Sequence, residues 1–158
     1  MTSAFVALGS NIGDRELHLR QATAALAAGG FQGLTASTVR ETAPMGVLDQ
    51  PAFLNQVVAG GWNSDPRSLL DLCLRIESEH GRQRTVRWGP RTLDLDLLLF
   101  GDVIIDEPGL HLPHPRLEER SFVLEPLNEL APEMLHPALG LTVSELWARL
   151  RPIDGEDR

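Results

Sequence analysis

Residues 92–100 read T-L-D-L-D-L-L-L-F, a run that alternates between leucine and aspartate before it becomes wholly apolar. Alternation with a period of two predicts a β-strand, because successive strand side chains point to opposite faces of a sheet. Asp94 and Asp96 are therefore expected on one face, about 7 Å apart along the strand. The opposite face is expected to be buried and to carry four leucines: Leu93, Leu95, Leu97 and Leu99.

Five segments with strand or helix signals lie upstream of this strand. Short apolar or β-branched runs predict strands, whereas a capping residue, apolar residues at helical spacing and a closing glycine predict helices. In chain order, these segments are a strand over 4–8 followed by a turn at 9–11, a helix capped by Asp14 and ended by Gly29, a strand over 34–42, a strand over 53–62, and a helix from Asp65-Pro66 to Gly81.

The order strand, helix, strand, strand, helix, strand predicts an α+β fold: a ferredoxin-like βαββαβ antiparallel sheet with helices packed on it. A C-terminal extension follows, with helices expected near 120–130 and after the capping box of Thr142 and Glu145. The chain has the length of one ordinary domain, so residues 1–158 are expected to form a single domain. Cys73 lies at helical spacing with apolar neighbours and is expected to be buried.

Composition excludes several classes of protein. The net charge of −8 argues against nucleic acid as a partner, and no apolar run approaches the ~20 residues of a membrane span. All 14 basic residues are arginine, so a P-loop lysine and Schiff-base chemistry are excluded. One cysteine and an N-terminus without signal-peptide features predict a cytoplasmic protein, and we expect a monomer.

Arginines gather immediately before the two aspartates. Carboxylate oxygens suit Mg²⁺, which also takes phosphate oxygens, and guanidinium groups bind phosphate through paired hydrogen bonds. Together they are typical of phosphoryl transfer, although a solvated strand face and a loop paired with surface carboxylates would give the same pattern. The arginines fall within ten residues: Arg82, Arg84, Arg87 and Arg91.

Other candidate residues are less specific. Residues 9–14 contain two glycines but lack the G-K-[ST] ending of a phosphate loop. Trp88 could cover a flat ligand or simply pack its own loop. The histidines show no zinc spacing; those considered for a site are His80, His111, His114 and His136.

At R-W-G-P-R-T-L-D-L-D the sequence resembles the 6-hydroxymethyl-7,8-dihydropterin pyrophosphokinase family of folate biosynthesis. The resemblance spans nearly the whole chain, through V-A-L-G-S-N, E-T-A-P-M-G, Q-P-A-F-L-N-Q-V and L-P-H-P-R-L-E-E-R-S-F-V-L-E-P-L. It implies an enzyme that moves the pyrophosphoryl group of ATP to the pterin hydroxymethyl group and releases AMP. It also implies two Mg²⁺ ions as cofactors.

The resemblance assigns roles to individual residues. The metal ligands would be Asp94 and Asp96, which join Arg82 and Arg91 as the catalytic group. The pterin pocket would consist of Thr42, Pro44, Met45, Phe53, Asn55, Trp88 and Phe122. The nucleotide would contact Leu70, Arg75, Glu77, Arg84, Leu97, His114 and Arg120.

Some positions depart from the family pattern. Phe53 stands where tyrosine is common, and Gly109 and His111 stand where some members carry arginine and threonine. Two other functions remain open on the residues alone. A metal-dependent phosphohydrolase would consume ATP without pterin, and an RNA-binding module would need exposed aromatic residues and a basic face.

Overall fold

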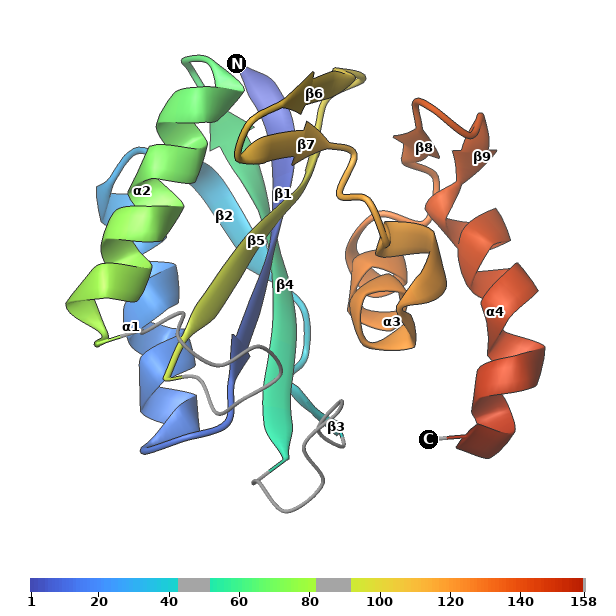
Figure 1. Ribbon diagram of the computed structural model, residues 1–158, viewed down its shortest axis with the longest axis horizontal. Helices are drawn as coiled ribbons and strands as arrows, with labels where there is room; N and C mark the ends of the chain where they lie inside the picture. The colour runs from blue at the N-terminus through green and yellow to red at the C-terminus, as the bar shows by residue number, and fades with distance from the viewer. Residues whose placement is uncertain (43–51, 82–91, 158) are drawn as a thin grey trace.

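The computed structural model describes residues 1–42, 52–81 and 92–157, and of residues 151–157 only the backbone. Figure 1 shows the central sheet with α1 and α2 on one side and α3 and α4 on the other. The elements that form the sheet and its first two helices are β1 (Thr2–Ser10), α1 (Arg15–Ala28), β2 (Gln32–Ala36), β3 (Arg40–Thr42), β4 (Phe53–Trp62), α2 (Pro66–Glu79) and β5 (Asp94–Phe100).

The strands pair in the order β2-β4-β1-β5, and β3 also pairs with β4. All of these pairs are antiparallel, which confirms the predicted ferredoxin-like α+β fold. The extension comprises β6 (Ile105–Glu107), β7 (Leu110–Leu112), the 3-10 turn η1 (Leu117–Glu119), α3 (Ser121–Leu130), β8 (Leu135–His136), β9 (Leu141–Thr142) and α4 (Val143–Asp157).

The predicted helix starts are confirmed by their caps. The Asp14 side chain accepts a hydrogen bond from the Leu17 N–H, and the Asp65 side chain accepts one from the Ser68 N–H. Thr142 and Glu145 form the reciprocal bonds of a capping box. Within the described ranges, no helix is both long and apolar enough to span a bilayer.

The single strand predicted over 34–42 is wrong, because Ser37 divides it into β2 and β3. The Ser37 N–H donates to the Val57 carbonyl, but the Val57 N–H donates to the Ser37 hydroxyl instead of a backbone carbonyl. The Ser37 carbonyl accepts from the Gln56 side chain. Side-chain groups therefore replace the regular ladder at this residue.

The predicted turn at 9–11 begins too early, because β1 continues to Ser10. Gly9 pairs with Asn55 on one side and with Asp94 on the other, so it belongs to the sheet. Its place between two strands matters for the site described below.

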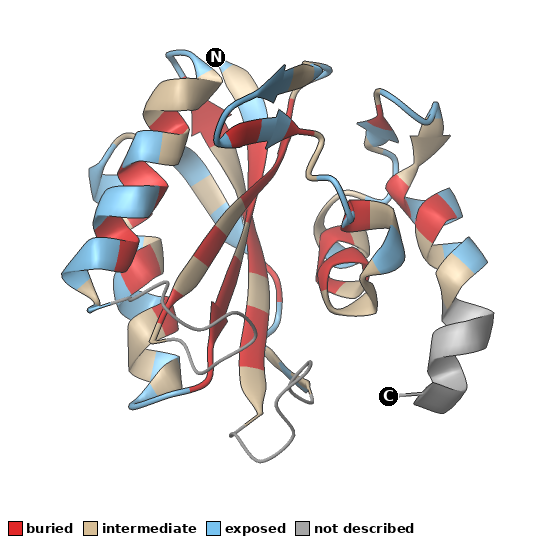
Figure 2. Cartoon of the chain, in the orientation of Figure 1, coloured by how far each residue is buried: buried red, intermediate tan, exposed pale blue. Residues whose placement is uncertain are grey.

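Two hydrophobic clusters fill the two sides of the sheet, and Figure 2 shows buried residues along β1, β4 and β5. Leu93, Leu95 and Leu97 lie in the cluster under α1 and α2, as expected. Leu99 lies in the other cluster, so its predicted face is wrong. The reason is a β-bulge: Phe5 pairs with Leu99 and Val6 with Leu97, which leaves Leu98 as an extra residue that reverses the alternation.

Cys73 is fully buried in α2, as predicted. Burial is the main cause that raises the pKa of its thiol to about 12, with the charge of Glu77 adding to the shift. Because thiolate is the reactive form, we expect less than about 1% labelling by a thiol reagent at pH 8 in the time that denatured protein is fully labelled. Mass spectrometry gives both extents, and rapid labelling of folded protein would contradict this burial.

Candidate functional site

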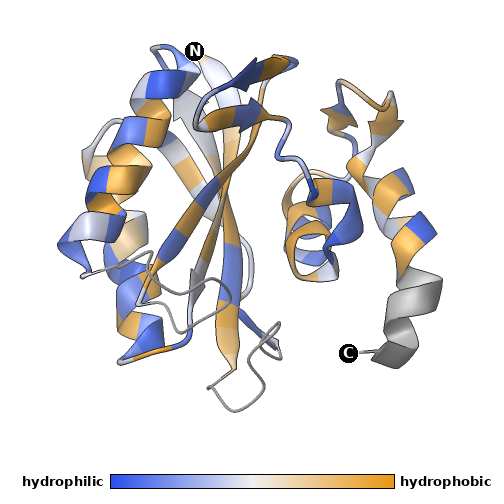
Figure 3. Ribbon diagram, viewed as in Figure 1, coloured by the Kyte–Doolittle hydropathy of each residue, from blue (hydrophilic) through white to orange (hydrophobic). Residues whose placement is uncertain are grey.

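Two polar side chains lie on either side of a glycine in a row that crosses three adjacent strands at one end of the sheet. Asp94 lies opposite Gly9, and Gly9 lies opposite Asn55, so β5, β1 and β4 each contribute one position. Asp96 lies opposite Ala7, two residues along, and so shares the face of Asp94. The predicted common face of the two aspartates, which are both half-buried, agrees with this register. Figure 3 shows hydrophilic and hydrophobic segments alternating along this part of β5.

Gly9 has no side chain and so leaves space for the side chains of Asn55 and Phe53. A Cβ atom at this position would lie 3.4 Å from Asn55 Oδ1 and 3.6 Å from Phe53 Cδ1. The side chains of Asn55 and Phe53 therefore lie over the backbone of β1, on the face that also carries the aspartates. Together they offer an amide group and an aromatic ring beside the carboxylate pair.

The amide of Asn55 is held in place by its neighbour on β3. Asn55 is 9% exposed, and its Nδ2 donates to Thr42 Oγ1. With Nδ2 engaged in this way, Oδ1 is the atom that approaches Gly9. The structure thus brings together three residues that the resemblance assigned to one pocket, Thr42, Phe53 and Asn55.

His114 and Arg120 lie on the aspartate side of the molecule, at the start of the C-terminal extension. The His114 N–H donates to the carbonyl of Leu98, the extra residue of the bulge, at 2.9 Å. Burial, with a further contribution from the charge of Arg120, lowers the pKa of His114 to about 4, although the charge of Asp94 acts in the opposite direction. His114 is therefore neutral at physiological pH and can accept or donate one hydrogen bond per ring nitrogen.

Phe122 lies beside Arg120 at the first turn of α3. The Arg120 guanidinium carbon is 5.8 Å from the centre of the Phe122 ring, within the range of a cation–π contact. Both side chains are half-buried. A residue assigned to the pterin and one assigned to the nucleotide thus adjoin each other.

The remaining nucleotide candidates lie on the α2 side of β5. Leu97 is buried under α2, on the face opposite Asp94 and Asp96, and Leu70 packs against the same cluster. Glu77 is 2% exposed, and its Oε2 accepts the Leu95 N–H at 2.7 Å. Arg75 is exposed on α2. Leu70, Glu77 and Leu97 therefore border the outer edge of the sheet, since β5 is its last strand, whereas Arg75, two residues from Glu77, faces another side of the helix.

Six assigned residues lie outside the described residues. Two belong to the segment that follows Thr42, and four belong to the segment that precedes Thr92. They are Pro44, Met45, Arg82, Arg84, Trp88 and Arg91.

The other histidines lie apart from the aspartate row. His80 ends α2, and its Nδ1 is 2.7 Å from that of His18. His111 Nδ1 contacts Asp106 across the β6–β7 hairpin at 2.7 Å, close to Gly109 in its turn. His136 is buried and accepts the Leu139 N–H. Of the four histidines considered from sequence, His114 is the one that the structure places near Asp94.

The donor set of the row suits Mg²⁺. In the part of the chain that the structure describes, no three His, Cys, Asp or Glu side chains converge as a complete metal site. Mg²⁺ commonly takes only one or two carboxylates and completes its shell with water and substrate phosphates. Asp94 and Asp96 on one face match that mode of binding. They do not match the larger sets of protein ligands that enclose Ca²⁺ or structural Zn²⁺.

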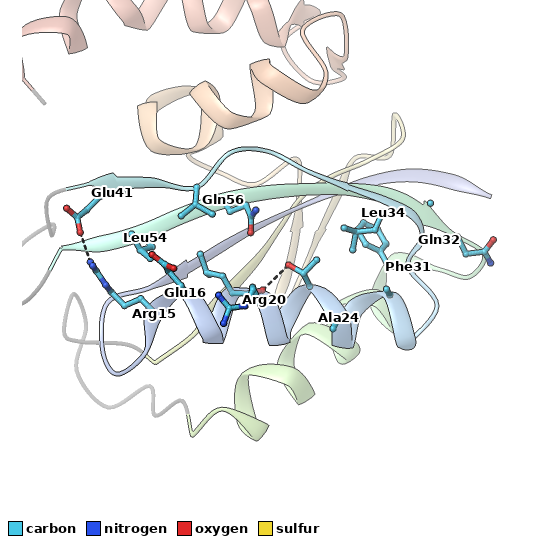
Figure 4. Close-up of a pocket in the computed structure, with 15 residues that line it drawn as sticks. Arg15, Glu16, Arg20, Ala24, Phe31, Gln32, Leu34, Glu41, Leu54 and Gln56 are labelled. Carbon is cyan, nitrogen blue, oxygen red and sulfur yellow. Dashed lines mark hydrogen bonds and ion pairs between the residues drawn. The ribbon is translucent and has the colours of Figure 1, made fainter.

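A separate groove of about 1350 Å³ lies on the opposite face of the sheet, between α1 and the β2–β4 edge. Figure 4 shows Arg15 reaching Glu41 at one end of this groove and Phe31 and Leu34 at the other. Leu54 of β4 lines the groove, whereas the adjacent Asn55 faces the aspartate row. The groove is therefore not part of the row.

Sequence reasoning missed a polar network beside the row. The Arg40 side chain, on β3, contacts Glu125 and Glu129 of α3. Two glutamates four residues apart share one side of a helix, which signals a site for a cation. That signal does not identify which of the 14 arginines would fill it.

Comparison with known proteins gives consistent matches. The family model of 7,8-dihydro-6-hydroxymethylpterin-pyrophosphokinase (HPPK) matches residues 5–132. A 2-amino-4-hydroxy-6-hydroxymethyldihydropteridine pyrophosphokinase of Bacillus subtilis is 50% identical over 132 residues, which cover 83% of this chain and 79% of that protein. One of Pseudomonas aeruginosa is 43% identical over 155 residues, which cover 98% and 94%.

Solved structures agree in fold. The chain superposes on a Plasmodium falciparum HPPK-DHPS crystal structure with a TM-score of 0.72 at 16% identity, covering 100% of this chain and 45% of that one. For an HPPK-DHPS in complex with substrates the TM-score is 0.77 at 12% identity, with 98% and 44% covered. The chain thus spans less than half the length of these structures. At such low sequence identities the similarity shows the fold alone.

Proposed function

The chain belongs to the 7,8-dihydro-6-hydroxymethylpterin-pyrophosphokinase family, and from this premise we propose which of its residues perform the reaction. The reaction of the family is transfer of the pyrophosphoryl group of ATP to 6-hydroxymethyl-7,8-dihydropterin in folate synthesis. The single observation that carries the assignment is the row on three adjacent strands, Asp94–Gly9–Asn55.

The carboxylates would bind the metal. Asp94 and Asp96 would hold two Mg²⁺ ions together with phosphate oxygens, and these ions would neutralise charge on the triphosphate and on the transferring group. Arg82 and Arg91 would bind the phosphates, with Arg84 in support, because guanidinium groups keep their charge at any working pH. The hydroxymethyl oxygen of the pterin would form a bond with the β-phosphorus as the bond from that phosphorus to the departing AMP oxygen breaks, and the hydroxyl proton would be released to solvent.

The pterin would bind at the Asn55 end of the row. A flat heterocycle packs against aromatic faces, which Phe53 and Phe122 supply, while the fixed amide of Asn55 matches the polar edge of the ring. The support is the Asn55–Thr42 hydrogen bond and the absence of a side chain at Gly9, over which Asn55 and Phe53 lie. Pro44, Met45 and Trp88 complete this pocket in our proposal.

The nucleotide would lie across the β5 edge. His114 and Arg120 approach from the aspartate side, while Leu70, Glu77 and Leu97 border the α2 side. Arg75 would reach the nucleotide from the exposed surface of α2. We expect His114 to act as a neutral hydrogen-bonding group, since its pKa of about 4 leaves it uncharged at physiological pH. Glu77 would contribute to nucleotide binding mainly by accepting the Leu95 N–H, which keeps strand β5 in position.

Incubation of the protein with ATP, Mg²⁺ and the reduced hydroxymethyl pterin tests this function. We expect AMP and pterin diphosphate in equal amounts, and less than about 1% of that rate without pterin or with excess chelator. Liquid chromatography with mass detection resolves both products. Release of phosphate from ATP independent of pterin would instead indicate the phosphohydrolase.

We also propose that residues 1–158 act as a single-domain monomer in the cytoplasm, without nucleic acid or membrane partners. A net charge of −8 supports the absence of nucleic acid. The continuous sheet and the two clusters on its faces support the single domain. Size-exclusion chromatography with light scattering measures the oligomeric state directly.

A further inference from the structure

Four side chains form an anchor between β3 and α3, which we call the β3–α3 anchor: Thr38, Arg40, Glu125 and Glu129. Arg40 Nη2 donates to Glu129 Oε1 at 2.9 Å, and Arg40 Nε lies 3.5 Å from Glu125 Oε1. The Thr38 N–H lies 3.0 Å from Glu129 Oε2, and the Thr38 hydroxyl donates to Oε1 at 2.9 Å. The two ends of the anchor are about 90 residues apart in the chain.

The anchor adjoins both walls of the proposed pterin pocket. Arg40 lies directly opposite Asn55 in the β3–β4 pair. Thr42 follows two residues later on the same face, and its hydroxyl accepts a hydrogen bond from the Asn55 amide. On α3, Glu125 is three residues after Phe122, so the two side chains neighbour each other on the helix surface. In the proposed pocket, one wall would supply the polar contacts to the pterin, and the other would supply the aromatic face of Phe122.

The anchor is more than an isolated surface pair. Glu129 accepts from a backbone N–H, a hydroxyl and a guanidinium, which fixes its carboxylate in one orientation. Burial would raise the pKa of Glu129, but these hydrogen bonds outweigh it and lower the pKa. Arg40 Nη1 is also buried and has no hydrogen-bond partner among the residues that the structure describes. A buried donor without a partner is destabilising, and a single exposed ion pair contributes too little free energy to offset that cost. The several bonds of the anchor can offset it, and together they set the distance between β3 and α3.

We propose that Arg40 is a positioning residue, which holds the Asn55–Thr42 wall at a fixed distance from the Phe122 wall and thereby sets the affinity for the pterin. The inference rests on the pterin pocket proposed above. The affinity for the pterin thus depends on a side chain that does not touch it. A flat ring bound between two walls loses contact on one side when the walls separate, so the effect falls on pterin binding and not on the phosphates.

Arg40→Met removes the charge and keeps most of the side-chain length. We expect KM for the pterin at saturating ATP to rise about tenfold, with kcat and KM for ATP within about twofold of the original. Glu129→Gln should raise the pterin KM similarly. The double variant should be no worse than the more severe single variant, because both act through one contact. Arg40→Lys should recover part of the affinity through a single bond to Glu129.

Arg67→Met is the matched control. Arg67 bridges α2 to Glu107 of β6 at 3.0 Å, an ion pair of similar length between two elements on the other side of the sheet. We expect it to leave the pterin KM unchanged. The midpoint of thermal unfolding, measured for every variant, distinguishes a loss of protein stability from a change in the spacing of the two pocket walls.

An unchanged pterin KM in Arg40→Met, with or without a lower unfolding midpoint, would reduce the anchor to a stabilising contact and overturn the inference. If Arg40→Met does not fold, Glu125→Gln, which weakens the longer contact, tests the same point and should raise the pterin KM by about threefold. Absence of pterin-dependent AMP formation by the unmodified protein would instead refute the proposed function. These two failures are therefore distinguishable.

Discussion

Asp96→Asn is expected to lower turnover by about a thousandfold or more when Mg²⁺ is limiting. The substitution keeps the size of the side chain but removes half of the carboxylate pair on the face that lies beside Gly9. An amide is a weaker ligand for Mg²⁺ than a carboxylate, so less metal and less triphosphate are held in position. The initial rate of AMP formation, measured over a range of Mg²⁺ concentrations, should show partial recovery at high metal.

Asp102→Asn provides the control for this measurement. Asp102 is exposed in the turn directly after β5 and bears the same charge, so its replacement changes net charge identically. It should leave turnover within about twofold. Near-normal activity of Asp96→Asn at limiting Mg²⁺ would remove Asp96 from the metal site and weaken the whole assignment of the row.

Asn55→Ala is expected to raise KM for the pterin by about a hundredfold. The amide is 9% exposed and held by Thr42, so it is oriented before the ligand arrives. Its removal leaves polar atoms of a bound pterin without partners, at a cost of about 1–3 kcal/mol for each. Loss of two such bonds gives about 3 kcal/mol, which corresponds to about two orders of magnitude in affinity.

The adjacent residue supplies the comparison. Gln56 is half-buried and bonds the Ser37 carbonyl, and it lines the groove on the opposite face of the same strand. Gln56→Ala should lower the thermal unfolding midpoint but leave the pterin KM unchanged. Steady-state kinetics with each substrate varied in turn would measure both variants. Equal pterin KM values for Asn55→Ala and the unmodified protein would exclude Asn55 from the pocket.

Local signals predicted most of the fold. Strand β4 has the predicted bounds 53–62, and both Asp14 and Asp65 cap their helices through their own side chains. These features depend on residues within a few positions of each other, which is the range over which turn and capping chemistry acts. The common face of Asp94 and Asp96 was predictable for the same reason.

Features that depend on a partner strand or a distant helix were not predictable. The bulge at Leu98 exists only relative to the register of β1, so the face of Leu99 could not follow from alternation. The break at Ser37 depends on the N–H of Val57, twenty residues away. Likewise, the approach of Asn55 to Gly9 and the pairing of Arg40 with Glu129 arise only when the sheet and α3 have assembled.

The extra residue in β5 can be gained or lost without changing the partners of the residues on either side of it. One leucine could replace another aliphatic residue at most of its buried positions at modest cost. Removal of Leu98 would leave Leu97 opposite Val6 and Leu99 opposite Phe5 in a regular strand, so the carboxylates, Leu99 and Phe100 would keep their present layers. Homologous chains that keep this site are therefore expected to differ by one residue at this point more readily than between Asp94 and Asp96, where one residue more or less would place the two carboxylates on opposite faces.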